Sequence, residues 1–104
     1  MSIYGKWIDA TISAGATESA VVDLGREYDY LSVKIPAMDV CKLYLKVAEM
    51  TGGTYYELGK ETTTAEETFN RADVWRLGGW RFIKVATSNP QTVSRTIRVC
   101  GMRY

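Results

Sequence analysis

The sequence has 104 residues, enough to bury one hydrophobic core but too few for two independent ones. Hydrophobic residues make up 46% of the chain and charged residues 24%, a balance that excludes an intrinsically disordered chain. Thirteen basic and twelve acidic residues give a formal charge of +1 and are scattered along the chain, without the basic run typical of nucleic-acid binding. We therefore expect one globular domain over residues 1–104.

The first third of the chain predicts three β-strands. Residues 3–12 are expected to form one strand, and residues 18–25 a second that ends at Gly25. In residues 28–36, Leu31, Val33 and Ile35 alternate with polar side chains, which is the pattern of a strand with one buried face. Pro36 ends this strand because it has no N–H to donate to a sheet.

The middle of the chain contains the longest alternating segment. Residues 41–50 place apolar side chains two apart rather than three or four apart, so they predict a strand and not a helix. The apolar positions are Cys41, Leu43, Leu45 and Val47, and the others are Lys42, Tyr44 and Lys46. Gly52 and Gly53 suit the positive φ angles of a tight hairpin turn. A strand over residues 54–59 is expected to follow.

Residues 60–77 give a mixed signal. Thr64 and Glu67 have the spacing of a helix capping box, and a helix ending at Gly78-Gly79 would have one apolar side. That side would carry Phe69, Ala72, Val74 and Leu77. Poor helix formers such as Asn70 and Asp73 oppose a long helix. We expect an irregular strand followed by at most one or two helical turns.

The last third predicts two more strands, over residues 81–88 and 93–104, separated by a turn at Ser88-Asn89-Pro90. Gly101 within the final strand indicates a bulge or a close neighbour. Seven or eight short antiparallel strands, spaced by roughly ten residues, are typical of an all-β, jelly-roll-like β-sandwich.

The order of these segments resembles a family of small phage and prophage proteins that are encoded among virion structural genes. The resemblance covers about residues 11 to 100 and rests on the segments AVVDLG, YLSVKIP, CKLYLKVAEM, TYYELG, GGWRFIKVATS, NPQTVS and RTIRV. The segment from Lys60 to Asp73 departs most from the pattern. The resemblance implies a virion-associated structural or accessory protein, such as a capsid decoration, neck, tail or fibre protein, without enzymatic activity.

The residues themselves offer no catalytic set. Histidine is absent, which removes the commonest general base and zinc ligand, and the sequence contains neither a GxSxG elbow nor a phosphate-binding loop. Paired carboxylates could catalyse glycoside hydrolysis, and loop carboxylates could hold a structural calcium ion. The candidate acidic residues of this sequence are instead expected on solvated strand faces and in loops, without the spacing that either site requires. They are Asp9, Asp23, Asp29, Asp39, Glu57, Glu61, Glu66 and Glu67. We expect a protein that is not an enzyme and that holds no cofactor or metal.

Two cysteines and the N-terminus bear on compartment. Cys41 falls on the buried side of its strand, so we prefer a free buried thiol. A disulfide between Cys41 and Cys100 remains the alternative. The N-terminal residues lack the apolar segment of a signal peptide, and no apolar run is long enough to span a membrane. We expect synthesis in the host cytoplasm and a final location in the virion.

Aromatic side chains are the best candidates for contacts. Three tyrosines and three lysines fall on the outward side of their strands and form the candidate partner-contact surface: Tyr28, Tyr30, Lys34, Lys42, Tyr44 and Lys46. The expected partners are copies of the same chain and other virion proteins, joined by strand addition or face-to-face packing, with no nucleic acid and no membrane. The alternatives are intramolecular cover of these tyrosines, and a carbohydrate-binding jelly-roll module that stacks sugars on them.

Overall fold

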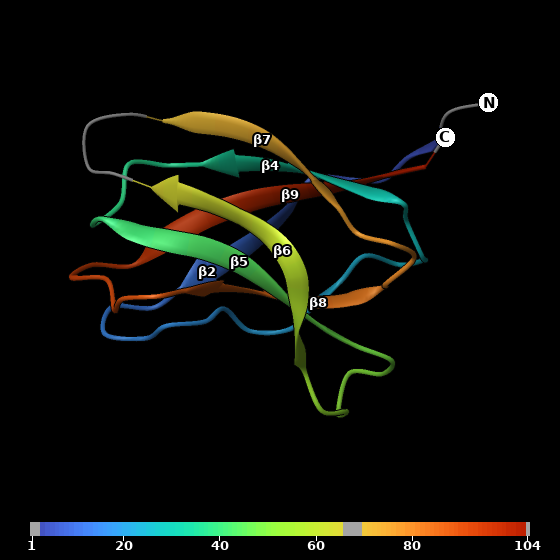
Figure 1. Cartoon of the computed structure of the whole chain (residues 1–104), viewed down its shortest axis with the longest axis horizontal. Coiled ribbons are helices and arrows are strands. Elements are labelled where there is room, and N and C mark those ends of the chain that lie inside the picture. Colours follow the sequence, from blue (N-terminus) through green and yellow to red (C-terminus); the bar gives the residue numbers. More distant parts are fainter. Residues whose placement is uncertain (1–2, 66–69, 104) are drawn as a thin grey trace.

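The computed structural model describes residues 3–65 and 70–103, which contain nine β-strands and no helix (Figure 1). The all-β prediction is confirmed. The strands are β1 (Ile3–Tyr4), β2 (Ile8–Ile12), β3 (Val22–Asp23), β4 (Tyr30–Ile35), β5 (Cys41–Ala48), β6 (Tyr56–Ala65), β7 (Arg71–Arg76), β8 (Phe82–Thr87) and β9 (Arg95–Arg103).

The strands form two antiparallel sheets that pack face to face. In the first, here called the β9 sheet, β1 and β2 both pair with β9, and β4 and β7 follow. The second, here called the β5 sheet, has the order β3-β8-β5-β6. Apart from β1 and β2, which share the β9 sheet, and the β5–β6 hairpin, successive strands cross between the sheets, and this connectivity is that of a jelly roll. The predicted β-sandwich is therefore confirmed.

A bulge separates β1 from β2. Tyr4 lies opposite Met102 and the Gly5 amide donates to the Gly101 carbonyl at 2.8 Å, but Ile8 lies opposite Val99. The N-terminal segment thus has one residue more than β9 between these pairs, which is the definition of a β-bulge. Because β1 and β2 act as one interrupted strand, the described residues fill eight strand positions, within the predicted seven or eight.

The core lies between the two sheets and follows the alternation in the sequence. The inward side chains of β4 and β5 are each 3% exposed or less: Leu31, Val33, Ile35, Cys41, Leu43, Leu45 and Val47. Trp75 from β7 is also buried, opposite Leu31. Full burial of each aliphatic side chain contributes roughly 1.5–3 kcal/mol, so this layer is the main source of stability.

The helical turns expected near residue 77 are wrong where the structure describes the chain. Residues 71–76 form β7, which pairs with β4 along its whole length. Ala72 and Val74 point outward and Trp75 points inward, as in a strand. Val74 is apolar although it is 53% exposed, and its apolar side chain is what gave the segment the spacing of a helical stripe. Glu67 and Phe69 lie outside the described residues.

The β5–β6 connection also differs from the prediction. Neither Gly52 nor Gly53 has a positive φ, and the turn is instead closed by the Gly53 amide, which donates to the Met50 carbonyl at 3.1 Å. The strand begins at Tyr56 rather than at residue 54 and continues to Ala65. Its register against β5 shifts between Tyr44 and Lys46, near Gly59, so the expected irregular strand is present within β6.

Candidate interaction surfaces

The six predicted contact residues do not form one surface. Tyr30 and Lys34 lie on β4, in the β9 sheet, whereas Lys42, Tyr44 and Lys46 lie on β5, in the other sheet. Their outward positions therefore belong to opposite faces of the sandwich. Alternation in the sequence separates the inside from the outside of a strand, but it does not tell which of the two sheets the strand joins.

Tyr28 was expected to be exposed, and this expectation is wrong. Its side chain is 5% exposed because it lies in the loop before β4, where the alternation no longer applies. The ring packs directly over Gly101: a Cβ added to Gly101 would lie 2.2 Å from Cδ2 of the ring, and one added to Gly5 would lie 2.8 Å from the hydroxyl. The close neighbour predicted for Gly101 is therefore confirmed, and it is Tyr28.

On the outer face of the β5 sheet, two of the lysines are neutralised within the chain. Lys46 and Lys84 bind the same carboxylate, that of Glu18, with Nζ–O distances of 2.9 and 3.2 Å. The hydrogen bond from Lys46, and then the one from Lys84, lowers the pKa of Glu18. The bond to Glu18 raises the pKa of Lys46 in turn. Tyr44 on the same face is half-buried and Lys42 is exposed.

On the outer face of the β9 sheet, a tryptophan lies among cations. The ring of Trp7, placed there by the β1–β2 bulge, is 4.4 Å from Nζ of Lys34 and 5.9 Å from Cζ of Arg98, measured to the ring centroid. Arg98 also binds Asp9 at 3.0 Å. Trp7 is 38% exposed. This aromatic and basic surface is called the Lys34 face.

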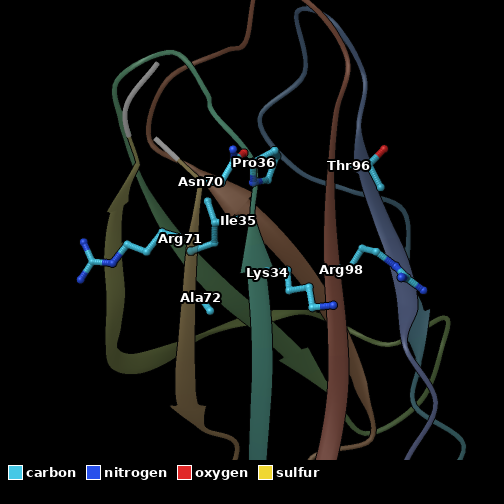
Figure 2. A pocket seen from close by; sticks show the side chains of 8 residues that line it. All are labelled: Lys34, Ile35, Pro36, Asn70, Arg71, Ala72, Thr96 and Arg98. Carbon is cyan, nitrogen blue, oxygen red and sulfur yellow. The ribbon is translucent and has the colours of Figure 1, made fainter. Parts of the chain in front are cut away.

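A shallow depression of about 450 Å³ opens on the Lys34 face. Figure 2 shows it between neighbouring strands, with Lys34 on β4, Ala72 on β7 and Arg98 on β9, while the side chain of Arg71 extends away from the others. Asn70 at its end accepts a hydrogen bond from the Ala37 amide at 3.1 Å, which ties β7 to the loop after β4. The sequence reasoning included Lys34 but missed Trp7, although Trp7 shares the outward phase of Asp9.

A second hollow lies at the opposite end of the sandwich, between the β5–β6 and β7–β8 loops. It consists of two adjoining depressions of about 300 and 360 Å³, which share Ala48, Glu49 and Trp80. Met50 and Tyr56 line the first and are 60% and 67% exposed, and the other lining residues include Glu27 and Arg81. This hollow is called the Trp80 groove. Trp75 is a core residue, whereas Trp80 is half-buried and packs against the core.

Backbone hydrogen bonds hold the β7–β8 wall of the Trp80 groove. The amides of Leu77 and Gly78 donate to the Asp29 carbonyl, at 2.8 and 3.1 Å, and the Gly79 amide donates to the Tyr28 carbonyl at 2.9 Å. Gly78 and Gly79 adopt positive φ angles of 70° and 93°, which other residues adopt only with strain. This wall of the groove is therefore fixed to the segment before β4.

The described part of the chain offers few residues for a metal site or a nucleophilic thiol. No group of three or more cysteine and acidic side chains is placed there to hold a metal ion. Cys41 and Cys100 are both buried free thiols, and burial raises the pKa of Cys41, which makes it a poor nucleophile at neutral pH. Within the same residues, no helix is long and apolar enough to cross a membrane.

No protein-family model matches the sequence, and no curated protein matches it either. Among solved structures, the chain is similar to the SPBc2 prophage-derived protein YomS, with 14% identity, a TM-score of 0.58, and coverage of 96% of this chain and 95% of YomS. At that identity the likeness shows a shared fold alone. The expected resemblance to a prophage β-sandwich protein is confirmed at this level.

Two further structures match more weakly. One is from Bacillus endospore appendages, described as disulfide-linked pili, with 13% identity, a TM-score of 0.46, and coverage of 100% of this chain and 88% of that one. The other is from the virus-like particle of the extra small virus of the prawn Macrobrachium rosenbergii, with 10% identity, a TM-score of 0.39, and coverage of 97% and 78%. Both TM-scores are below 0.5, so neither match carries an argument.

Proposed function

We propose that this protein is a non-enzymatic structural or accessory component of a bacteriophage virion, in capsid decoration or in the neck or tail. It acts through assembly contacts with copies of itself and with other virion proteins. The observation that supports this most is the distribution of side chains: aromatic and charged residues that the core does not use gather on the Lys34 face and in the Trp80 groove. The fold shared with a prophage-derived protein agrees with this proposal.

Faces are better suited to these contacts than strand edges. The edge strand β3 has only two residues, and β6 is interrupted by the register shift near Gly59. On the edge strand β7, Asp73 lies opposite the buried Val33 and so places a carboxylate on the inner side of the edge. Short strands, bulges and inward charges are the usual devices that prevent strand addition. Assembly is therefore expected through faces and loops rather than through these three edges.

The positions of the tyrosines argue against the alternative that this protein binds carbohydrate by stacking sugars on them. Tyr28 is buried, and Tyr30 and Tyr44 are half-buried on opposite faces of the sandwich. Three rings so placed do not make the flat exposed platform that stacking on sugars requires. We therefore retain protein–protein contact as the function.

The proposal is tested by asking whether the chain is part of a particle. Phage particles are purified on a density gradient from the source strain and from a strain in which the gene is deleted, and both samples are examined by quantitative mass spectrometry. The chain is expected in the wild-type particles at a fixed ratio to the major shell or tail protein. Recovery only from the soluble fraction would remove the proposal.

A further inference from the structure

The Trp80 groove has the chemistry of a site for a cationic side chain. Its rings, Trp80 and Tyr56, present electron-rich faces, and Glu27 and Glu49 add two carboxylates. The one guanidinium in its lining, Arg81, already binds Asp23, with contacts of 2.7 and 3.1 Å. Among the described residues, Glu49 makes no ion pair and is exposed. A basic group entering the groove would thus meet unneutralised negative charge.

The Lys34 face offers the complementary group. Lys34 is exposed and makes no ion pair with any described residue, and its ammonium rests on the ring of Trp7. The pairing of Lys34 with Trp7 shows that this chain already uses cation–ring contacts at its surface. Because no carboxylate among the described residues binds it, the Lys34 ammonium remains available to an acidic partner.

These two surfaces lie at opposite ends of the molecule. Lys34 is near the end of β4, next to the β4–β5 loop, whereas Ala48 ends β5 and Trp80 lies in the β7–β8 loop. Because β5 runs from the first end to the second, one chain cannot bring its own Lys34 face into its own Trp80 groove. Two copies placed head to tail can do so, and such a heterologous contact repeats into a ring or a filament.

We propose that the Trp80 groove of one copy receives the Lys34 face of the next, with Lys34 directed at Glu27, Glu49 and the groove's rings. This inference rests on the proposed function, which requires copies of the chain to associate. It names the contact: a head-to-tail interface between unlike surfaces, selected by charge. Since a symmetric pairing of two Lys34 faces would bring two basic surfaces together, like-charge repulsion favours the head-to-tail arrangement.

The test uses charge reversal in the full chain. Lys34→Glu and Glu49→Lys each place like charges in the contact, so each is expected to weaken self-association at least about tenfold in sedimentation velocity. Lys42→Glu changes an exposed lysine on the outer face of the other sheet and is expected to leave the association as in wild type. All three positions are exposed, so unchanged circular dichroism and thermal midpoints verify that the fold is intact.

Recovery of self-association in charge-swapped variants distinguishes this contact from any other. The double variant Lys34→Glu/Glu49→Lys has both signs reversed and is expected to associate again. An equimolar mixture of the two single variants is also expected to associate, as alternating copies, because each Lys34 face then meets a groove of opposite charge. If both single variants are weak and neither the double variant nor the mixture recovers, the two surfaces do not touch each other and the inference is overturned.

The two levels of failure are distinct. A wild-type chain that stays monomeric at every concentration would remove self-association itself, and with it this inference. A wild-type chain that associates, while Lys34→Glu behaves like Lys42→Glu, would leave the proposed function standing and remove only the assigned contact.

Discussion

At the scale of single residues, the clearest constraint is the contact between Gly101 and Tyr28. The tyrosine ring fills the space that a side chain at Gly101 on β9 would occupy, and its hydroxyl lies against Gly5 in the β1–β2 bulge. A glycine on β9 and a glycine in the neighbouring bulge therefore make a slot for one aromatic ring. A buried ring of this size contributes several times the burial energy of a methyl group, which explains why small residues are required beneath it.

Replacing Gly101 by alanine is expected to lower the free energy of unfolding by about 2–3 kcal/mol, because the new methyl group overlaps the ring of Tyr28. Gly52→Ala is the matched control, since a Cβ there meets no atom within 4 Å and the φ angle is ordinary. Urea unfolding measures both. Equal midpoints for the two variants would mean that Tyr28 does not occupy the slot.

At the scale of elements, alternation predicted β4, β5, β8 and β9, because in these strands every second side chain is buried. Alternation did not predict β7, because at this edge strand the apolar Val74 lies on the outer face of the sheet and the half-buried Asp73 on the inner face. It also failed for Tyr28, which is buried from a loop. Such positions are set by contacts between segments far apart in the chain, and a local pattern does not contain them.

The ion pairs of Glu18 link β5 and β8 to the segment before β3. Because the pKa of Glu18 is lowered in the folded chain, these pairs stabilise the fold fully above its ordinary value of 4.5 and lose that contribution as pH falls through the lowered pKa. Glu18→Gln is expected to cost about 0.5–1 kcal/mol at about pH 7, a small value because the groups are partly solvated.

The difference in unfolding free energy between wild type and Glu18→Gln is expected to shrink as the pH is lowered from about 7 to about 3. Urea unfolding at a series of pH values measures it, with Asp29→Asn as a control carboxylate that makes no ion pair among the described residues. A difference that stays constant with pH would show that the loss comes from packing and not from the charge of Glu18.

At the scale of the whole molecule, the sequence predicted the sandwich but not the two surfaces. The strands that carry Lys34 and Lys42 look alike in the sequence, yet they belong to opposite sheets, and that partition arises only when eight strand positions pack around one core. The Trp80 groove likewise joins two loops about thirty residues apart in the chain. The candidate contact residues were therefore partly predictable as outward side chains, but their grouping was not.

The central claim is that this chain works by assembling, and native mass spectrometry of the purified full-length protein over a range of concentrations tests it most directly. The expected result is a discrete set of species at integer multiples of 11.7 kDa, which dissociate to the monomer on denaturation. A spectrum that contains the 11.7 kDa monomer alone at every concentration would contradict the account.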